Sequence, residues 1–542
     1  MRDAGIDFWQ PGLAPADQTT MATSTNRLFS ALVLVLAAAP AACSSFGSDP
    51  APGASDSVPE PGRADAGDPD AGPKKAPVVN GTPDPSEFTE SFGVFVAPNG
   101  QAAAAGTRKQ PLASIQAGIV LGKSLGKRVY VCGGTFRESM VMADSISVIG
   151  GLDCSREEWR PGTTRTRVEA PASPAVAAKA IASATRMENL EIIAPDASEP
   201  GASSYGLLAV ESPGLSLVSS RVEAGNGRKG ADGVDGIQLV QTGTLNGANG
   251  RSQGDACFGL ACSNNPGTPP GGTSICTGAA GKDGAQGGNG GTGGLYNFNG
   301  GIFGWVPVSA SSAAAVGVLR SEGVAAKGTD GTSAAAGAVR LSADGYLPAG
   351  GTAGTDGDPG KAGSGGAGVK PSGTPPADPD FPNRTPRWFG SNGAGGGAGG
   401  CPGLAGTPGS GGGASIAIVV VGSPMTIDRS DLVAHGGGAG GRGTLGSSPS
   451  PGGRPGVDYA LGPNSAGRNG SAGGAAGVSG SGAGGPSYGL AFTAAAPTMT
   501  KTTSKAGRGG DGVPELSNPD ALGNPRTVPA SAQGIAQDVL VP

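Results

Sequence analysis

The stretch GTAGTDGDPGKAGSGGAG, residues 351–368, places a glycine at every third position from Gly351 to Gly366. A triplet of this kind is typical of the collagen triple helix. Collagen is nevertheless a poor interpretation, because the glycine runs of this chain are short, contain little proline and break register. Another structure that needs a glycine at every third residue has to be considered.

The same triplet spacing recurs at 227–236, 278–293, 390–399, 400–412 and 437–446. Two interpretations remain. In the first, these runs are flexible, solvated loops. In the second, they are extended left-handed strands with three residues per turn that lie side by side. Glycine at the contact positions would then let neighbouring backbones hydrogen-bond to one another. The second interpretation explains the regular spacing, which flexibility alone does not require.

The composition argues against ordinary globular domains. Glycine contributes 104 and proline 46 of the 542 residues, and aromatic residues are only 4%, so a large conventional core is not expected. Charged residues make up 15% and the formal net charge is -5, which gives no electrostatic basis for binding nucleic acid. We expect burial to come from short aliphatic stretches and from backbone packing.

The N-terminal region has the pattern of an export signal. Residues 28–42 (LFSALVLVLAAAPAA) are an apolar run preceded by Arg27 and followed by Cys43. This order is that of a secretory signal, and the run is too short for a comfortable transmembrane span. We expect Met21 to be the true start.

Cys43, between Ala42 and Ser44, resembles the lipidated cysteine of bacterial lipoproteins. The resemblance implies a lipid attachment site at Cys43 and a membrane partner through that anchor. Pro40 stands where the family prefers a leucine-like residue, so ordinary cleavage near Ala39 and free secretion are the alternative. The following residues, 44–90, are rich in Pro, Asp, Ala and Gly and predict a disordered tether.

The cysteine content agrees with export. Six cysteines remain after Cys43, an even number that favours disulfides in an exported chain: Cys132, Cys154, Cys257, Cys262, Cys276 and Cys401. The spacing of Cys257 and Cys262 is not that of a zinc site, and His435 is the only histidine. We therefore expect no metal and no cofactor.

Residues 93–171 combine short β-type runs with one helical pattern. GVFVAPNG (93–100), RVYVC (128–132) and SISVIGG (145–151) predict strands, whereas residues 110–128 carry apolar side chains at helical spacing. In order and spacing this region resembles the N-terminal part of bacterial right-handed parallel β-helix proteins of the pectate-lyase-like superfamily.

That resemblance implies an all-β fold, a right-handed parallel β-helix solenoid with a short N-terminal capping helix. Long glycine-rich insertions would emerge from it. Cys132 and Cys154 lie about one coil apart, so the resemblance places them on neighbouring coils, where they form either a disulfide or two buried thiols.

A unit of about 20 residues repeats imperfectly further along the chain. Residues 210–227 parallel residues 421–438, and residues 315–331 are a weaker third copy. Each copy predicts a strand, a polar turn and a second short strand that runs into glycines. The repeats indicate coils of one solenoid with insertions on one face.

Much of the segment 225–512 resembles the glycine-rich, PGRS-type surface proteins of bacteria, as in GAGGGAGG (393–400). This resemblance implies a role at the cell envelope or surface. The expected organisation is a leader at 1–43, the tether at 44–90, the N-terminal part of the β-helix at 91–224, coils interrupted by glycine-rich insertions at 225–512, and a C-terminal segment at 513–542.

The sequence contains no recognisable catalytic motif. Lyases and glycosidases of this fold use clustered carboxylates, but Arg320, Asp330, Arg340 and Asp344 have no spacing that marks them as a set. The Asp-Gly pairs in the two GTDG strings, at 328–331 and 354–357, predict turns.

We therefore expect a non-catalytic structural or adhesive protein, held at the bacterial outer membrane or cell surface as a lipoprotein, or secreted. Its expected partners are extracellular polysaccharide or other surface proteins. The alternative from another class is a secreted carbohydrate-active enzyme, a polysaccharide lyase or a glycoside hydrolase, on the same fold. A third hypothesis is an unstructured filler attached to a small folded head at 93–171.

Overall fold

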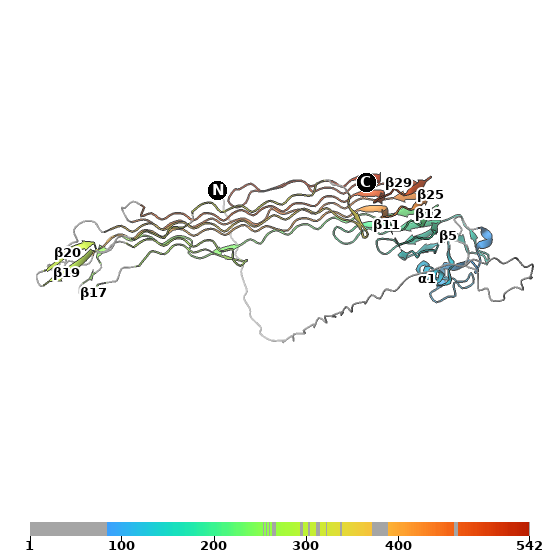
Figure 1. Ribbon diagram of the computed structural model, residues 1–542, viewed down its shortest axis with the longest axis horizontal. Coiled ribbons are helices and arrows are strands. Elements are labelled where there is room, and N and C mark those ends of the chain that lie inside the picture. The colour runs from blue at the N-terminus through green and yellow to red at the C-terminus, as the bar shows by residue number, and fades with distance from the viewer. Residues whose placement is uncertain are drawn as a thin grey trace, which may run out of the picture. The chain divides into compact units, whose positions relative to one another are not determined.

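Short strands that alternate buried and partly exposed residues, as in β7 (Thr166–Glu169) and β10 (Leu190–Ile193), are typical of a sheet with one face in a core. The computed structural model describes residues 84–252, 254–255, 257–258, 261–262, 267–292, 296–301, 304–310, 315–320, 322–335, 339–370, 388–459 and 464–540. This part of the chain is nearly all-β, with parallel sheets and one α-helix (Figure 1). The expected all-β class is thereby confirmed.

Three sheets of parallel strands, which we call sheets A, B and C, contain most of the strands. Sheet A contains β1 (Gly93–Gln101), β2 (Arg128–Cys132), β5 (Val148–Asp153), β9 (Thr185–Glu188), β12 (Leu215–Val218), β25 (Thr426–Asp428) and β28 (Thr498–Thr500), with β6 (Arg160–Pro161) antiparallel to β5. Sheet B contains β3 (Thr135–Phe136), β7, β10, β13 (Arg221–Glu223), β26 (Asp431–Val433) and β29 (Thr503–Lys505). Sheet C contains β4 (Met140–Val141), β8 (Val176–Lys179), β11 (Ser204–Val210), β24 (Ser415–Val421), β27 (Ser487–Phe492) and β32 (Ala536–Val539).

From β7 onward, the strands of the three sheets follow one another in the repeating order B, C, A. Each strand pairs in register with the strand of the same sheet one round earlier, as Leu215–Val218 does with Thr185–Glu188. The chain therefore adds one strand to every sheet in each round, and side chains at equivalent positions stack above one another.

The stacked side chains form the core. One buried ladder runs along each sheet, through Val129, Val148, Met187, Leu217 and Ile427 in sheet A, Val168, Ile192, Val222 and Leu432 in sheet B, and Val176, Leu207, Ile418 and Leu490 in sheet C. Full burial of such a side chain contributes about 1.5–3 kcal/mol. These ladders are therefore the main apolar contribution to stability in the sheets.

Helix α1 (Ile115–Leu125) lies against β1 and β2, the first strands of sheet A. Ser114 caps its N-terminus, the Glu138 carboxylate accepts from the N–H groups of Ile115 and Gln116, and Gly126 ends it at φ 64°. The expected helix is confirmed. Before it, residues 84–90 pack on the folded part rather than belonging to the tether, because η1 (Pro85–Glu87) leads into a buried Phe88. The expected leader, Met21, Cys43 and residues 44–83 lie outside the described residues.

The long insertions leave the sheets at one place in the round. They connect β13 to β24, β26 to β27 and β29 to β32, always from sheet B to sheet C. Short antiparallel pairs occur within them: β14 (Val240–Thr242) with β18 (Ile275–Thr277), β15 (Gly254–Asp255) with β23 (Trp388–Phe389), β16 (Cys257–Phe258) with β17 (Ala261–Cys262), β19 (Tyr296–Gly301) with β20 (Gly304–Ala310), β21 (Leu341–Ser342) with β22 (Gly345–Tyr346), and β30 (Leu516–Ser517) with β31 (Thr527–Val528).

Two of the three predicted repeat copies are equivalent in the structure. Residues 210–227 and 421–438 supply β12 with β13 and β25 with β26, which pair in register. The prediction that residues 315–331 are a third copy was wrong. Their described residues form no strand and hydrogen-bond to other glycine-rich segments, as the N–H of Val318 does to the carbonyl of Asn289. Gly317, Gly328 and Gly331 interrupt the apolar alternation that a strand of the sheets needs.

A ladder of buried serines joins the sheets to the insertions. Ser204, Ser415 and Ser487 begin β11, β24 and β27, pair with one another across sheet C, and are fully buried. Their hydroxyls donate to the carbonyls of Pro195, Gly225 and His435 at 2.6–2.7 Å, and accept from the N–H groups of Gly225, His435 and Gly507 at 2.8–2.9 Å. Each serine thus fixes the point at which an insertion leaves sheet B.

We expect Ser415→Ala to lower the free energy of unfolding by about 1–3 kcal/mol, because it removes both hydrogen bonds from a buried position. Denaturant unfolding followed by circular dichroism measures the change. Thr498→Ala, at an exposed position of β28, is the control and should change stability by less than about 0.5 kcal/mol. A Ser415→Ala protein as stable as the control would contradict the role of the ladder.

Candidate functional site

The glycine-rich insertions pack around one central segment, residues 390–414. Residues 390–404 and 411–414 are all buried, although they carry few large side chains. Figure 1 shows the glycine-rich segments running side by side. We call them the glycine lattice, defined as residues 225–251, 269–292, 315–320, 322–335, 349–370, 390–414, 435–459, 464–486 and 506–535. Backbone hydrogen bonds of 2.7–3.2 Å join the central segment to 228–251, 285–291, 351–369, 438–456 and 465–483 and to Gly272.

The three residues of each triplet on the central segment donate in three different directions. The N–H groups of Gly393, Gly396 and Gly399 bond to residues 285–291. Those one residue later in the triplet, such as Gly397 and Gly400, bond to 465–483. Those two residues later, such as Gly395 and Ala398, bond to 228–251, except that Leu404 donates to the Ser447 hydroxyl. A chain with three residues per turn returns to the same side at every third residue. The hydrogen bonds show the same period, so neighbours on all sides satisfy the buried backbone.

The glycines quoted at the start are required by contact with these neighbours. A Cβ atom on Gly351, Gly357, Gly363 or Gly366 would overlap backbone carbonyl groups of residues 465–480. A Cβ atom on Gly360 would overlap the N–H of Gly400, in the central segment. Because backbone cannot move aside as a flexible side chain does, only glycine fits. The central segment has neighbours on more sides, and accordingly carries glycine at two of three positions in much of 393–400.

Polar side chains accept hydrogen bonds from lattice N–H groups that have no backbone carbonyl as a partner. In each case a lattice glycine donates its N–H to the carbonyl of a residue on a neighbouring segment. The N–H of that same residue donates to the side chain of the Asn or Asp that immediately precedes the glycine. Thus Gly233 donates to the carbonyl of Arg442, and the N–H of Arg442 donates to Asp232 at 2.7 Å. The pairs Asn226–Gly436, Asn246–Arg454, Asn249–Val457 and Asp330–Val478 repeat this arrangement.

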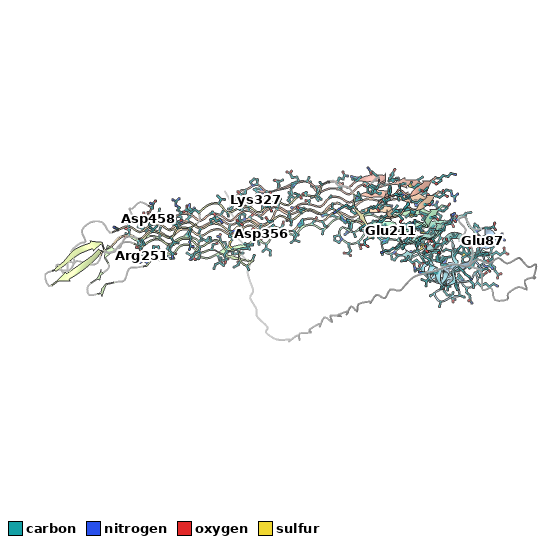
Figure 2. All side chains as sticks on the ribbon, in the orientation of Figure 1. Glu87, Glu211, Arg251, Lys327, Asp356 and Asp458 are labelled. Atoms are coloured by element: carbon teal, nitrogen blue, oxygen red, sulfur yellow. A yellow bond between two sulfur atoms is a disulfide. The ribbon has the colours of Figure 1, made fainter. Side chains whose placement is uncertain are left out.

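The Asp-Gly pairs of the two GTDG strings are therefore not turns, and that prediction was wrong. Asp330 accepts from the N–H of Val478 at 3.0 Å, and Asp356 accepts from the N–H of Ala405 at 2.8 Å. Figure 2 shows Asp356 and Lys327 along the lattice, away from the sheets. Aspartate favours turns by bonding to its own backbone, but here a neighbouring segment supplies the donor. The sequence signal for this role is an Asn or Asp placed just before a glycine of the triplet series.

Proline marks the places where a neighbour ends. Gly393, Gly396 and Gly399 donate to residues 285–291, but further along the same triplet phase stand Pro402, Ala405 and Pro408. Proline has no N–H, and Ala405 donates to the Asp356 carboxylate instead. No backbone donor in this phase, from 393 to 408, is left without an acceptor.

The register of the lattice slips at two places. Between the bonds Gly233–Arg442 and Gly247–Arg454 it slips by two residues, and between Asp358–Ala326 and Gly365–Val318 by one. Each slip spans a glycine outside the extended conformation, Gly243 at φ 108° and Gly323 at φ 140°. Positive φ is accessible to glycine at little cost, so these positions absorb the change of phase.

Two disulfides are present among the described residues. Cys132, at the end of β2, is bonded to Cys154, with Cα atoms 5.6 Å apart, which is the pair that the coil spacing nominated. Cys276, in β18, is bonded to Cys401 of the central segment, with Cα atoms 5.7 Å apart. Cys257 and Cys262 lie opposite each other in the β16–β17 pair.

Charged side chains gather on the outer face of sheet B, but they neutralise one another. A row of ion pairs with N···O distances of 2.8–3.8 Å passes through Glu169, Arg167, Glu191, Arg221 and Glu223, and a ring nitrogen of His435 is hydrogen-bonded to Glu223 at 2.9 Å. Burial acts to raise the pKa of Glu223, yet hydrogen bonds from Arg221 and His435 outweigh it and hold the pKa below its usual range. A glycosidase acid needs the opposite shift, so Glu223 does not meet that requirement.

The other residues considered as catalytic candidates are dispersed or serve the lattice. Asp330 pairs with Lys327 at 2.8 Å, and the N–H of Arg320 bonds to Ser364. Asp344 lies in the turn between β21 and β22, bonded to Ser342. Within the described ranges, no three His, Cys, Asp or Glu side chains are placed to hold a metal ion.

We expect adjacent glycines to differ sharply in their tolerance of alanine. Gly351→Ala puts a Cβ into backbone atoms of Gly480 and Ser481, whereas the Cβ of Gly350→Ala would have its nearest neighbour at 3.5 Å. Gly351→Ala should cost about 1–3 kcal/mol, and Gly350→Ala should be neutral or stabilise by up to about 1 kcal/mol. Denaturant unfolding of the two variants measures this. Equal effects would contradict close backbone packing.

Because the pKa values of Asp232, Asp330 and Asp356 in the lattice are lowered, we expect the protein to lose stability in acid. Hydrogen bonds from the N–H of Arg442 and from Lys229 lower the pKa of Asp232. Burial acts to raise the pKa of Asp330, but hydrogen bonds from Lys327 and the N–H of Val478 outweigh it and lower that pKa. Asp356 behaves in the same way, with Lys282 and the N–H of Ala405 as the donors. A pKa lower in the folded state stabilises it above the unfolded pKa, and this contribution is lost as the pH falls below about 4.

Unfolding of the wild type and of the triple variant Asp232→Asn, Asp330→Asn, Asp356→Asn between pH 6 and pH 2 tests this. Asparagine keeps the acceptor oxygen but does not titrate in this range. The wild type should lose more stability toward pH 2 than the variant. Parallel pH profiles would contradict the assignment.

Comparison with known proteins gives no relative: the chain matches no family model, no curated protein and no solved structure. None of the helices in the described part of the chain is long and apolar enough to cross a bilayer.

Proposed function

We propose that this protein is a non-catalytic, extracytoplasmic structural or adhesive protein that displays binding surfaces on a stiff backbone lattice. The observation that supports this most directly is the central segment 390–414, which is hydrogen-bonded through its backbone to neighbours on all sides. The backbone groups of this segment are engaged in hydrogen bonds to neighbouring segments, and its glycines lie against the backbones of those segments. It is suited to holding other parts of the chain in place.

The proposed architecture has two parts. The rotation of strands through sheets A, B and C would be one right-handed parallel β-helix, because parallel connections of this kind are almost always right-handed. The glycine lattice would be a bundle of polyglycine II-like strands inserted between sheets B and C. The B-to-C insertions and the three-residue period of their hydrogen bonds support this proposal.

The proposed location is the cell envelope or the exterior of a bacterium. Two disulfides are typical of a protein that folds in an oxidising compartment. The apolar run before Cys43 and the small residues around it support a signal and a lipid anchor, and release after cleavage is the alternative. The PGRS-like composition of 225–512 points to the same location.

The alternative function is a secreted carbohydrate-active enzyme on the same fold. The row of charged residues on sheet B, with the His435 ring nitrogen 2.9 Å from Glu223, is the observation that favours it. The pairing of each of its carboxylates with a cation weighs against it.

Fractionation of the native cells tests the proposed location and role. We expect the wild type to carry labelled fatty acid, to sediment with membranes and to be cut by protease added to intact cells, whereas Cys43→Ser is released in soluble form. Cys401→Ser, which breaks a disulfide but leaves the leader unchanged, is the control and should remain with the membranes. Residence in the cytosol with reduced cysteines would overturn the proposal, and depolymerisation of a polysaccharide by the purified wild type would favour the enzyme.

A further inference from the structure

Asn-Gly pairs recur in the lattice, where an acceptor side chain often stands directly before a contact glycine. Six such lattice pairs have described side chains, and their asparagines are Asn226, Asn246, Asn249, Asn289, Asn392 and Asn469. Asn-Gly is also the dipeptide most prone to spontaneous deamidation, because glycine has no side chain that hinders attack on the preceding asparagine. The lattice therefore depends on a chemically labile sequence.

Deamidation requires two groups of the pair to move together. The backbone nitrogen of the glycine attacks the side-chain carbonyl carbon of the asparagine, and the new N–C bond closes a succinimide ring. The amide nitrogen leaves as ammonia, with the proton that the glycine nitrogen gives up. A solvent water then opens the ring, so that asparagine and water become ammonia and either aspartate or isoaspartate.

Hydrogen bonds hold both reacting groups in five of the six pairs. The side-chain amide is bonded at 2.8–3.0 Å: Asn226, Asn246, Asn249 and Asn289 accept from the N–H groups of Gly436, Arg454, Val457 and Gly271, and Asn392 donates to the carbonyl of Gly267. The N–H of the following glycine is bonded to a carbonyl at 2.8–3.0 Å in each case, in Gly227, Gly247, Gly250, Gly290 and Gly393. A pair held in this way reacts only after local opening of the lattice.

Asn469 is the exception among the six. Its side chain is exposed and has no hydrogen-bond partner within the described part of the chain, so only the N–H of Gly470 is held, by the carbonyl of Gly453 at 3.0 Å. Exposure alone does not distinguish this site, because Asn246 and Asn249 are exposed as well. The difference lies in the missing bond to the amide.

We propose that Asn469 is a site of spontaneous deamidation in the folded protein, and that lattice hydrogen bonds protect the other five pairs. This inference goes beyond the proposed function and does not rest on it. The aspartate product keeps the backbone unchanged. Isoaspartate adds one atom to the backbone between Arg468 and Ser471, whose carbonyls accept from Gly397 and Gly400 of the central segment at 2.9 Å. That product therefore loosens the lattice at its centre.

Incubation of the full-length mature protein in mildly alkaline buffer, followed by peptide mass spectrometry, measures the rate at which each amide is lost. The rate at each site is divided by the rate at the same site in guanidinium chloride, where the chain is unfolded and the sequence alone decides. We expect this ratio to be about tenfold or more higher for Asn469 than for each of the five held asparagines, because only they require local opening.

Arg454→Pro tests the protecting bond directly. It removes the N–H that donates to Asn246 but keeps the carbonyl that accepts from Gly247, and a strand with three residues per turn has the φ that proline fixes. Arg454→Ala keeps the N–H and is the matched control. Asn246 should deamidate about as fast as Asn469 in Arg454→Pro and remain slow in Arg454→Ala. Asn249, held by Val457, should remain slow in both and report an intact lattice.

Three results would overturn the proposal: a ratio for Asn469 as low as those of the five held sites, a held site in the wild type as fast as Asn469, or an Asn246 rate in Arg454→Pro equal to that in Arg454→Ala. Circular dichroism shows whether Arg454→Pro folds. If it does not, the comparison of the six sites in the wild type decides by itself.

Discussion

Hydrogen bonding between backbones of neighbouring segments is the interaction on which the glycine-rich half of this protein depends. An extended chain with three residues per turn makes no internal hydrogen bonds, so each buried N–H and C=O of the segment 390–414 needs a partner on an adjacent segment. That requirement sets the distance between backbones, and the distance in turn excludes a Cβ at the contact positions. The frequency of glycine along a segment therefore follows the number of neighbours that the segment has.

The sheets and the lattice stabilise the chain by different means but share one alignment. In the sheets, stacked aliphatic side chains fill a core, and the strands of successive rounds pair in register. In the lattice, the segments that follow β13 and β26 run parallel to each other, just as those two strands do. The buried ladder of Ser204, Ser415 and Ser487 lies where the two regions meet. Its hydrogen bonds fix the first residues of the lattice segments relative to the strands of sheet C.

The sequence predicts the type of each structural element better than it predicts which segments lie next to one another. The triplet spacing in 351–368 indicates close backbone contact, and the helical spacing of apolar residues within 110–128 predicts α1. Which segments become neighbours is not readable, because a glycine offers no side chain that distinguishes one neighbour from another. Cys276 and Cys401 are separated by 125 residues in the sequence, and their pairing depends on which lattice segments are neighbours. Asp330 and Asp356 were assigned to turns because local rules consider only the residues beside them in the chain.

The two register slips at Gly243 and Gly323 show how strictly the phase is kept elsewhere. Adding one residue to a segment with three residues per turn would rotate everything beyond it by a third of a turn. In a segment such as 351–363, where glycine occupies one position in three, the glycines would leave their contacts and bulkier residues would enter. Evolution can therefore lengthen such a bundle readily only by whole triplets, or by supplying a kink that restores the phase. Insertions and deletions that keep the lattice intact are therefore expected to have lengths that are multiples of three residues. This constraint comes from the packing of the backbone and is separate from the three-base codon.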